Sequence, residues 1–187
     1  MDKQIDAYCS LLIKWNHKIN LIGHSTESEI RKRHVDDCLQ LQEFISGKKA
    51  SIVDLGSGAG LPGVILAIGG YENITLIESD QKKCVFLREV RRELNLHYDV
   101  LNSRIEEIKD KTFSIITSRA LASLEHLIEL SLPLMDKDSI CYFLKGENVT
   151  EEISDAQKRY SFNFKLYPSK TSCTGSILEV KNISTLN

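Results

Sequence analysis

A short apolar segment, Ile-Val-Asp-Leu at 52–55, runs directly into a glycine-rich turn, Gly-Ser-Gly-Ala-Gly-Leu-Pro-Gly, at 56–63. Glycines at alternate positions tolerate positive φ angles and let another molecule approach the backbone closely. Pro62 suits the first turn of a helix, where a missing N–H costs nothing. The pattern predicts a strand, a tight turn and a helix at the carboxyl edge of a parallel sheet, which is where such sheets bind ligands. A purely structural turn needs only one or two glycines, so we favour ligand binding.

Further apolar segments follow this turn and alternate with helical stretches. We predict strands at 51–55, 74–78, 98–102, 113–117 and 139–144, and helices near 62–69, 81–95 and 123–134. Strands separated by helices form βαβ units, whose parallel sheet carries helices on both faces. The expected fold class is therefore α/β with a mostly parallel sheet.

The beginning of the chain is helical. One apolar stripe has the spacing of an amphipathic helix and consists of Ile5, Tyr8, Leu12 and Trp15. Thr26 with Glu29 three positions later is typical of a capping box, which predicts a second helix that runs to about residue 44.

The end of the chain has a different pattern. Residues 162–168 and 176–182 resemble strands, and the turn-rich loop between them leaves no room for a helix. This predicts a closing antiparallel pair at one edge of the sheet. We therefore expect a single domain over residues 1–187, with a helical extension at 1–49 and the sheet-containing core at 50–187.

The composition excludes several classes of protein. The chain has 24 Lys and Arg against 26 Asp and Glu, a net charge of −2, so it is not a globally basic nucleic-acid binder, although a local basic face is still allowed. No apolar run approaches the ~18 residues that cross a bilayer, and the first residues lack the layout of a secretory signal. Five cysteines without metal-ligand spacing indicate free thiols in a reducing compartment. We expect a cytoplasmic protein with no membrane segment and no bound metal.

Two registers of the glycine turn imply different ligands. Residues 58–63 fit the dinucleotide pattern GxGxxG, and Glu78 follows at the spacing of a ribose-binding acid. In the other register Asp54 precedes the alternate glycines. The two carboxylate oxygens of Glu78 can accept both hydroxyls of a ribose, which suits NAD or S-adenosylmethionine. The second register fits better for two reasons. The first glycine of the dinucleotide pattern should lie at the end of the strand, whereas Gly58 lies four residues after Asp54, and the chain after Glu78 is too short to form a separate substrate domain as well as the rest of the sheet. A small NAD(P)-dependent oxidoreductase is the alternative, whereas a P-loop is excluded because no Gly-Lys-Ser/Thr follows.

Several short motifs together resemble those of one family. The segment VDLGSGAGLPG (53–63) is similar to the first motif of class I S-adenosylmethionine-dependent methyltransferases. Its LPG ending resembles the small-subunit ribosomal RNA methyltransferase G family, also called glucose-inhibited division protein B. Further matches follow that family's order: KWNHKINLIG (14–23), RHVDDCL (33–39), SRIEE (103–107), SRAL (118–121) and LKG (144–146). The resemblance implies a Rossmann-like class I methyltransferase sheet with an antiparallel terminal strand, preceded by N-terminal helices.

The resemblance also implies an activity: methyl transfer from S-adenosylmethionine to N7 of a guanine, guanine 527, in the decoding-region loop of 16S ribosomal RNA. Guanine N7 carries a lone pair and no proton, so direct in-line attack on the sulfonium methyl needs no general base. Positioning alone then supplies much of the rate. The sequence agrees, because it lacks the motifs typical of adenine N6 and cytosine C5 methylation. A non-catalytic ribosome-associated module is a further alternative.

By resemblance, one set of residues holds the cofactor, and Arg119 within it is catalytic. The set is Asp54, Gly56, Gly58, Gly60, Leu61, Glu78, Ser79, Ile105, Glu106 and Arg119. At the carboxyl end of a central strand, Arg119 binds the methionine carboxylate or a nucleotide phosphate, or instead pairs with a local acid such as Glu106. Asp54 either contributes to binding or only accepts hydrogen bonds from the loop.

Two basic regions are candidates for RNA contact. In the helix near 81–95, Lys82 and Lys83 occupy the first turn, where the helix dipole disfavours cations, and phosphate contacts would compensate. The other region lies in the helical extension. The predicted RNA-binding residues are Asn16, Lys18, Asn20, Arg33, His34, Lys82, Lys83, Arg88 and Lys145. The alternatives are a solvated charged face and, for His34, a core or capped histidine. The expected partner is 16S ribosomal RNA or the small ribosomal subunit, bound by a monomer.

Overall fold

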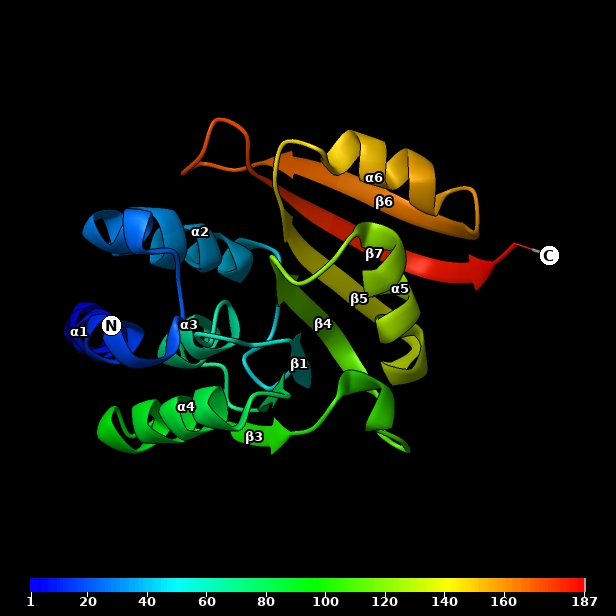
Figure 1. Cartoon of the computed structure of the whole chain (residues 1–187). Helices are drawn as coiled ribbons and strands as arrows, with labels where there is room; N and C mark the ends of the chain where they lie inside the picture. Colours follow the sequence, from blue (N-terminus) through cyan, green and yellow to red (C-terminus); the bar gives the residue numbers. More distant parts are fainter. Residues whose placement is uncertain (187) are drawn as a thin grey trace.

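The computed structural model describes residues 1–186, which fold around a seven-stranded sheet (Figure 1). The strands are β1 Ile52–Leu55, β2 Ile74–Glu78, β3 Asp99–Asn102, β4 Phe113–Arg119, β5 Met135–Lys145, β6 Tyr160–Pro168 and β7 Ser176–Thr185. The α-helices are α1 Asp2–Ile19, α2 Asp36–Leu39, α3 Gly63–Ile68, α4 Gln81–Glu93, α5 Leu124–Ser131 and α6 Val149–Ala156. The strand order β3-β2-β1-β4-β5-β7-β6 confirms the predicted α/β class with a mostly parallel sheet.

The centre of the parallel part is β1, which pairs with β2 on one side and with β4 on the other. All four residues of β1 are buried, because helices cover both faces of the sheet, as parallel sheets require. The strand order reverses between β1 and β4, since the chain builds outward to β3 and then returns. Open α/β sheets bind ligands beyond the carboxyl ends of the strands at such a reversal.

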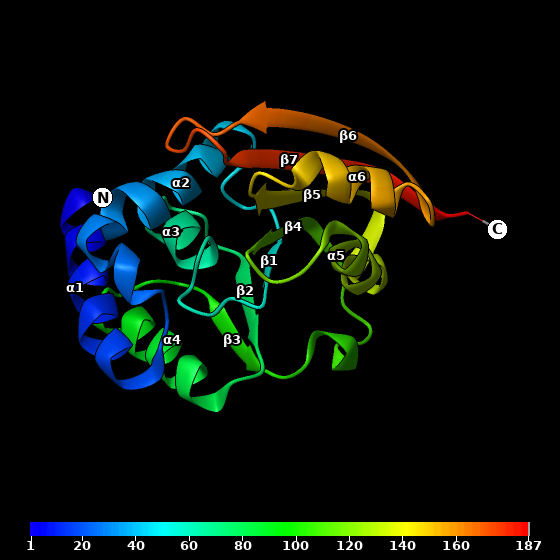
Figure 2. The same ribbon diagram turned by 45° about the horizontal axis from the view of Figure 1, so that its top comes forward.

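Helices cover the two faces of the sheet as two separate layers (Figure 2). On one face, α3 and α4 are joined by the N-terminal helices in a shared core that includes Tyr8 and Phe86. On the other face, α5 and α6 pack over Phe143 and its neighbours. The Tyr8 hydroxyl also donates to the Ala59 carbonyl at 2.7 Å. The N-terminal extension therefore supports the glycine turn directly.

The segment after α1 differs from the single helix that the sequence predicts. It consists of a 3-10 turn at His24–Glu29, a π-helical turn at Arg31–Val35, the short α2 and a second 3-10 turn at Gln40–Glu43. Thr26 caps no helix, because its hydroxyl donates to the Gly23 carbonyl at 2.7 Å and lies 2.8 Å from His34 Nε2. The capping-box prediction is wrong, since a tertiary contact occupies the Thr26 side chain.

The antiparallel end of the sheet contains the two predicted strands and, in addition, a helix that the sequence pattern did not predict. β7 pairs antiparallel with both β5 and β6, which confirms the predicted closing pair. The sequence analysis misses α6, although Val149, Ile153 and Ala156 are buried at helical spacing. This helix connects β5 to β6 and supplies one wall of a cavity described below. Within residues 1–186, no helix has the length and apolar character needed to cross a membrane.

Candidate functional site

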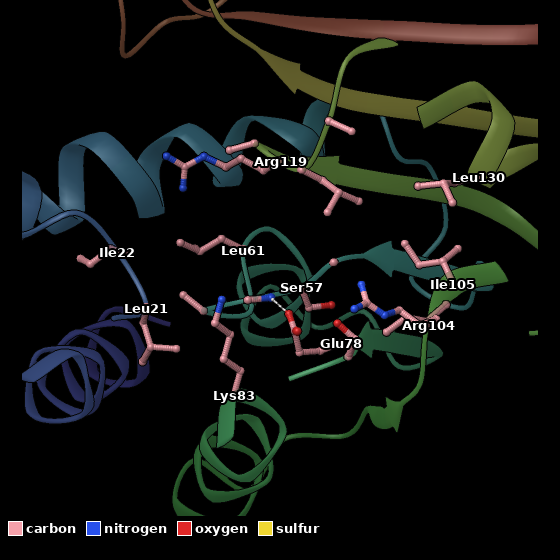
Figure 3. Close-up of a pocket in the computed structure, with 18 of the residues that line it drawn as sticks. Leu21, Ile22, Ser57, Leu61, Glu78, Lys83, Arg104, Ile105, Arg119 and Leu130 are labelled. Carbon is pink, nitrogen blue, oxygen red and sulfur yellow. Dashed lines mark hydrogen bonds between the residues drawn. The ribbon is translucent and has the colours of Figure 1, made fainter. Parts of the chain in front are cut away.

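A cavity of 530 Å³ opens beside the glycine turn, at the carboxyl ends of β1, β2 and β4 (Figure 3). Small-molecule sites typically have volumes of about 300–1,000 Å³. Eight of the ten predicted cofactor-binding residues line it: Gly56, Gly58, Leu61, Glu78, Ser79, Ile105, Glu106 and Arg119. Asp54 and Gly60 are not in its lining. The structure thus brings most of the predicted set to one place.

The glycine turn has the backbone shape that its sequence predicts. Gly56, Gly58 and Gly60 have φ angles of 62°, 53° and 87°. A Cβ on Gly58 would approach only the Gly56 carbonyl, at 3.8 Å, so this glycine keeps the cavity wall open. A Cβ on Gly60 would overlap Val64 of α3. Gly60 therefore allows the turn to pack against α3, and this role explains the glycine without a cofactor contact.

Asp54 is fully buried beneath the turn. Its Oδ2 accepts from the Gly63 N–H at 3.2 Å, and its Oδ1 accepts from the Thr117 hydroxyl at 3.1 Å. Burial raises the pKa of Asp54 to about 7, although hydrogen bonds from Gly63, Ser57 and Thr117 act in the opposite direction. Of the two roles that the sequence leaves open, the structure favours an acceptor that fastens the turn to the start of α3.

Glu78 ends β2 with its carboxylate against the glycine turn (Figure 3). Its Oε2 accepts from the Gly58 N–H at 2.8 Å, and its Oε1 accepts from the Asp80 N–H at 2.7 Å. The residue is only 7% exposed, so these two bonds hold the carboxylate in one orientation at the cavity wall. Each carboxylate oxygen still has a lone pair available for a ligand. This arrangement suits the two hydroxyls of a ribose.

Apolar side chains line two further parts of the cavity (Figure 3). Ile105 and Leu130 lie on one side, and Leu21 and Ile22 lie on the other. The backbone N–H groups of Leu21 and Ile22 donate to Asn16 Oδ1 at 2.6 and 2.8 Å, which fixes the chain as it leaves α1. The sequence analysis misses Leu21 and Ile22. They lie in a motif that resembles the family, but no local pattern shows that this segment reaches the glycine turn.

Arg119 ends β4, and its guanidinium is held by the N-terminal extension. Its Nη2 lies 2.7 Å from His34 Nδ1 and donates to the Arg33 carbonyl at 3.1 Å. Its Nε lies 3.6 Å from Asp37 Oδ2. The alternative that Arg119 pairs with an acid therefore holds, but the acid is Asp37 of α2 and not Glu106. The chain separation between Arg119 and these partners explains why sequence spacing does not reveal them.

His34 lies on the π-helical turn and is almost entirely buried. Both ring nitrogens are engaged, Nδ1 with Arg119 and Nε2 with the Thr26 hydroxyl. Burial, followed by the charges of Arg119 and Arg33, lowers the pKa of His34 to about 4. The ring is therefore neutral at neutral pH. This environment favours the alternative of a core histidine over direct RNA contact.

A second cavity, of 940 Å³, adjoins the first. Its walls come from the π-helical turn, the loop after β4, the first turns of α6 and the loop between β6 and β7. The two cavities share five lining residues, namely His34, Arg119, Ala120, Leu121 and Ala122. The two cavities therefore adjoin along the strip that begins at Arg119.

Two residues predicted to contact RNA are engaged inside the protein. Asn16 is fully buried, and its Nδ2 donates to Glu27 Oε1 at 2.5 Å in addition to the bonds described above. The Lys145 side chain is 7% exposed, pairs with Glu152 at 2.5 Å and donates to the Ala122 carbonyl at 2.9 Å. The contacts of Asn16 favour a structural role inside the protein over RNA contact. Lys145 also lines the second cavity, so its contact with RNA stays a prediction.

The other predicted RNA-binding residues lie on two surfaces. Lys18 and Asn20 are exposed at the end of α1, and Arg33 is exposed at the edge of the second cavity. On α4, Lys82 and Arg88 are exposed, and Lys83 lines the first cavity. Figure 3 shows Lys83 and Arg119 on opposite sides of that cavity. RNA contact by these exposed residues stays a prediction.

Two of the solved structures that resemble the chain are described as a methyltransferase and a methylase. One is a magnesium protoporphyrin IX methyltransferase from Synechocystis PCC 6803 with bound S-adenosylmethionine (TM-score 0.63, 11% identity, 92% of this chain and 96% of that chain). Another is a ribosomal protein L11 methylase from Lactobacillus delbrueckii subsp. bulgaricus (TM-score 0.62, 15% identity, 81% of this chain and 77% of that chain). These similarities confirm the predicted class I methyltransferase fold.

Sequence comparison gives closer relatives. The family model described as rRNA small subunit methyltransferase G matches residues 1–178. The ribosomal RNA small subunit methyltransferase G of Gluconobacter oxydans is 41% identical over 180 residues, which cover 96% of this chain and 93% of that protein. The protein of the same name from Dinoroseobacter shibae is 42% identical over 175 residues, which cover 91% and 90%. The resemblance seen in the short motifs is confirmed: this chain belongs to the rRNA small subunit methyltransferase G family.

Proposed function

We propose that this protein transfers a methyl group from S-adenosylmethionine to 16S ribosomal RNA, at N7 of a guanine that corresponds to guanine 527. The observation that carries the proposal is the meeting of two cavities along the strip at Arg119. The first has the size and groups of a cofactor site, and the second is large enough for a nucleotide. Transfer between two reactants requires such adjoining sites, because the reacting atoms must meet in line.

The residues of the first cavity fit S-adenosylmethionine. The open wall at Gly58 admits a ligand close to the backbone, and the fixed carboxylate of Glu78 offers acceptors to a ribose. Ile105 and Leu130 offer apolar surface to an adenine ring. When bound, this cofactor supplies an electrophilic methyl group on a sulfonium. The family to which the chain belongs and the cofactor-bound structural neighbour support the same assignment.

The junction of the cavities supports a reaction that needs no general base. Among the described residues shared by both cavities, His34 is the one with an unprotonated nitrogen at neutral pH, and that nitrogen faces Arg119. The five shared residues include no carboxylate, and Asp37 of the second cavity is paired with Arg119. Guanine N7 presents its lone pair without losing a proton, so positioning and exclusion of water are sufficient.

The test is methyl transfer from tritiated S-adenosylmethionine to deproteinised 16S RNA and to small ribosomal subunits, both from cells that lack the gene. We expect label on one guanine, located by mass mapping, and no label on RNA from cells that carry the gene. Binding of S-adenosylhomocysteine without transfer would favour the non-catalytic ribosome-associated module. Calorimetric binding of NADH in place of S-adenosylhomocysteine would reject the cofactor assignment.

A further inference from the structure

The Arg119 guanidinium is fixed at two different nitrogens. Nη2 faces His34 Nδ1 at 2.7 Å, and Nε faces Asp37 Oδ2 at 3.6 Å. The side chains of Arg119 and Asp37 are each 18% exposed, so solvent screens their attraction only in part. Two contacts at separate nitrogens set the plane of the guanidinium as well as its position. Nη1 lies outside these contacts.

The hydrogen bonds around His34 have a single consistent direction. A guanidinium only donates, so His34 Nδ1 accepts and the ring proton is on Nε2. Nε2 then donates to the Thr26 hydroxyl, which donates to the Gly23 carbonyl. Gly23 lines the cofactor cavity. A continuous series of donors and acceptors therefore links the wall of that cavity to Arg119.

Asp37 links Arg119 to the far wall of the second cavity. Its Oδ1 accepts from Ser169 Oγ at 3.1 Å, from Thr171 Oγ1 at 3.0 Å and from Gln40 Nε2 at 3.2 Å. Thr171 lies on the loop between β6 and β7 and lines the second cavity. Because these three hydrogen bonds occupy Asp37 Oδ1, the other carboxylate oxygen, Oδ2, is the one that faces Arg119.

We propose that His34 and Asp37 are positioning residues for methyl transfer, which hold the Arg119 guanidinium at the junction of the two cavities. Nη1 is then available to an oxyanion of the bound reactants, either the carboxylate of the cofactor's methionine part or an RNA phosphate. Loss of either contact lets the guanidinium turn away from the junction. This inference rests on the proposed methyl transfer. His34 and Asp37 then affect the rate of transfer only by orienting Arg119.

A double-mutant cycle between Asp37→Asn and Arg119→Ala tests the proposal in steady-state kinetics of methyl transfer. Asparagine keeps the size and one acceptor of Asp37 but removes its charge. We expect Asp37→Asn to lower kcat/KM roughly 10- to 100-fold when Arg119 is present. In the Arg119→Ala background the same change should have less than about a twofold effect. Additive losses would overturn the proposal. Asp36→Asn is the matched control, because Asp36 faces Arg31 at 4.0 Å instead, and should leave kcat/KM unchanged.

His34 provides a second test that does not depend on the stability of an Asp37 variant. His34→Asn places an amide oxygen near the position of Nδ1, which can still accept from Arg119. His34→Gln places its amide near Nε2, which keeps the contact with Thr26 and loses the one with Arg119. We expect the glutamine variant to lose far more activity than the asparagine variant. Equal losses, or a larger loss in the asparagine variant, would overturn the role of Arg119.

Calorimetry with S-adenosylhomocysteine separates the two sources of the oxyanion. Weaker binding to Asp37→Asn identifies the methionine carboxylate, whereas unchanged binding with a raised KM for RNA identifies a phosphate. A change in none of these quantities contradicts the positioning role. Failure of the proposed function is distinct, since the wild-type protein would then bind S-adenosylhomocysteine and transfer no methyl group to RNA.

Discussion

Asp54→Asn tests the energetic effect of the carboxylate buried beneath the glycine turn. In the folded protein the pKa of Asp54 is about 7, compared with an ordinary value of 3.8. Because the folded pKa is raised, the stability from this group is fully present below pH 3.8 and is lost as the pH rises through about 7. At about 1.4 kcal/mol per unit, the rise from pH 5 to pH 8 removes roughly 2–3 kcal/mol from the free energy of unfolding.

Asparagine can replace the contacts of Asp54 without a charge. Its amide oxygen can accept from the Gly63 N–H, while its NH₂ donates to the Thr117 hydroxyl, whose own hydrogen points to the Val53 carbonyl at 3.3 Å. The stability of the variant should therefore depend less on pH. Relative to the wild type, its free energy of unfolding should rise by roughly 2–3 kcal/mol between pH 5 and pH 8.

Urea unfolding followed by far-UV circular dichroism at pH 5, 6, 7 and 8 measures this difference. Asp138→Asn on β5 is the matched control, because Asp138 is exposed and should show no such trend. A difference between Asp54→Asn and wild type that stays constant across the range would refute the argument that burial raises the pKa of Asp54. Binding of S-adenosylhomocysteine should persist, since Asp54 does not line the cavity.

Three further substitutions test separate parts of the site. Glu78→Ala should weaken S-adenosylhomocysteine binding by roughly tenfold or more in calorimetry, because hydrogen bonds to a charged group contribute about 1.5–3 kcal/mol. Unchanged binding would show that Glu78 is not part of the site. Lys145→Met should lower the melting temperature by several degrees, because it removes the ion-pair partner of Glu152 on α6. An unchanged melting temperature with weaker RNA binding would instead support Lys145 as an RNA contact in the second cavity. Gly63→Ala should lower the free energy of unfolding, measured in urea, by about 1–3 kcal/mol, because the new Cβ would overlap Leu76. Gly146→Ala should leave this free energy unchanged, because its Cβ would meet open space. Equal stability of the two glycine variants would show that α3 shifts freely.

Local sequence patterns were sufficient to predict most strands of the parallel sheet. Each predicted strand of the alternating region overlaps an observed one, since short apolar runs between helices have few other ways to bury their side chains. Residues 24–43 are helical, but the first turn begins before Thr26 and the turns change type, because a threonine and a glutamate at capping spacing are compatible with several turns. The contact of His34 with the Thr26 hydroxyl excludes the predicted cap.

The sequence also predicted most of the residues that line the first cavity, with two exceptions. Gly60 and Asp54 belong to the motif but lie behind the cavity wall, where Gly60 packs against Val64 and Asp54 accepts from the Gly63 N–H. The RNA predictions were weaker. The residue type of Asn16 or Lys145 does not reveal that a neighbouring loop or an acid on α6 occupies the side chain.

The sequence by itself determined the glycine turn, the acid at the end of β2 and the family, because backbone freedom and short spacing are local properties of the chain. Only the tertiary structure decided what surrounds Arg119. Its partners His34 and Asp37 precede it by more than 80 residues and reach it because the π-helical turn and the start of α2 lie against the Arg119 side chain at the end of β4. The second cavity arises in the same way, from α6 and the β6–β7 loop meeting the extension. Such contacts depend on how distant elements pack, and no local periodicity encodes them.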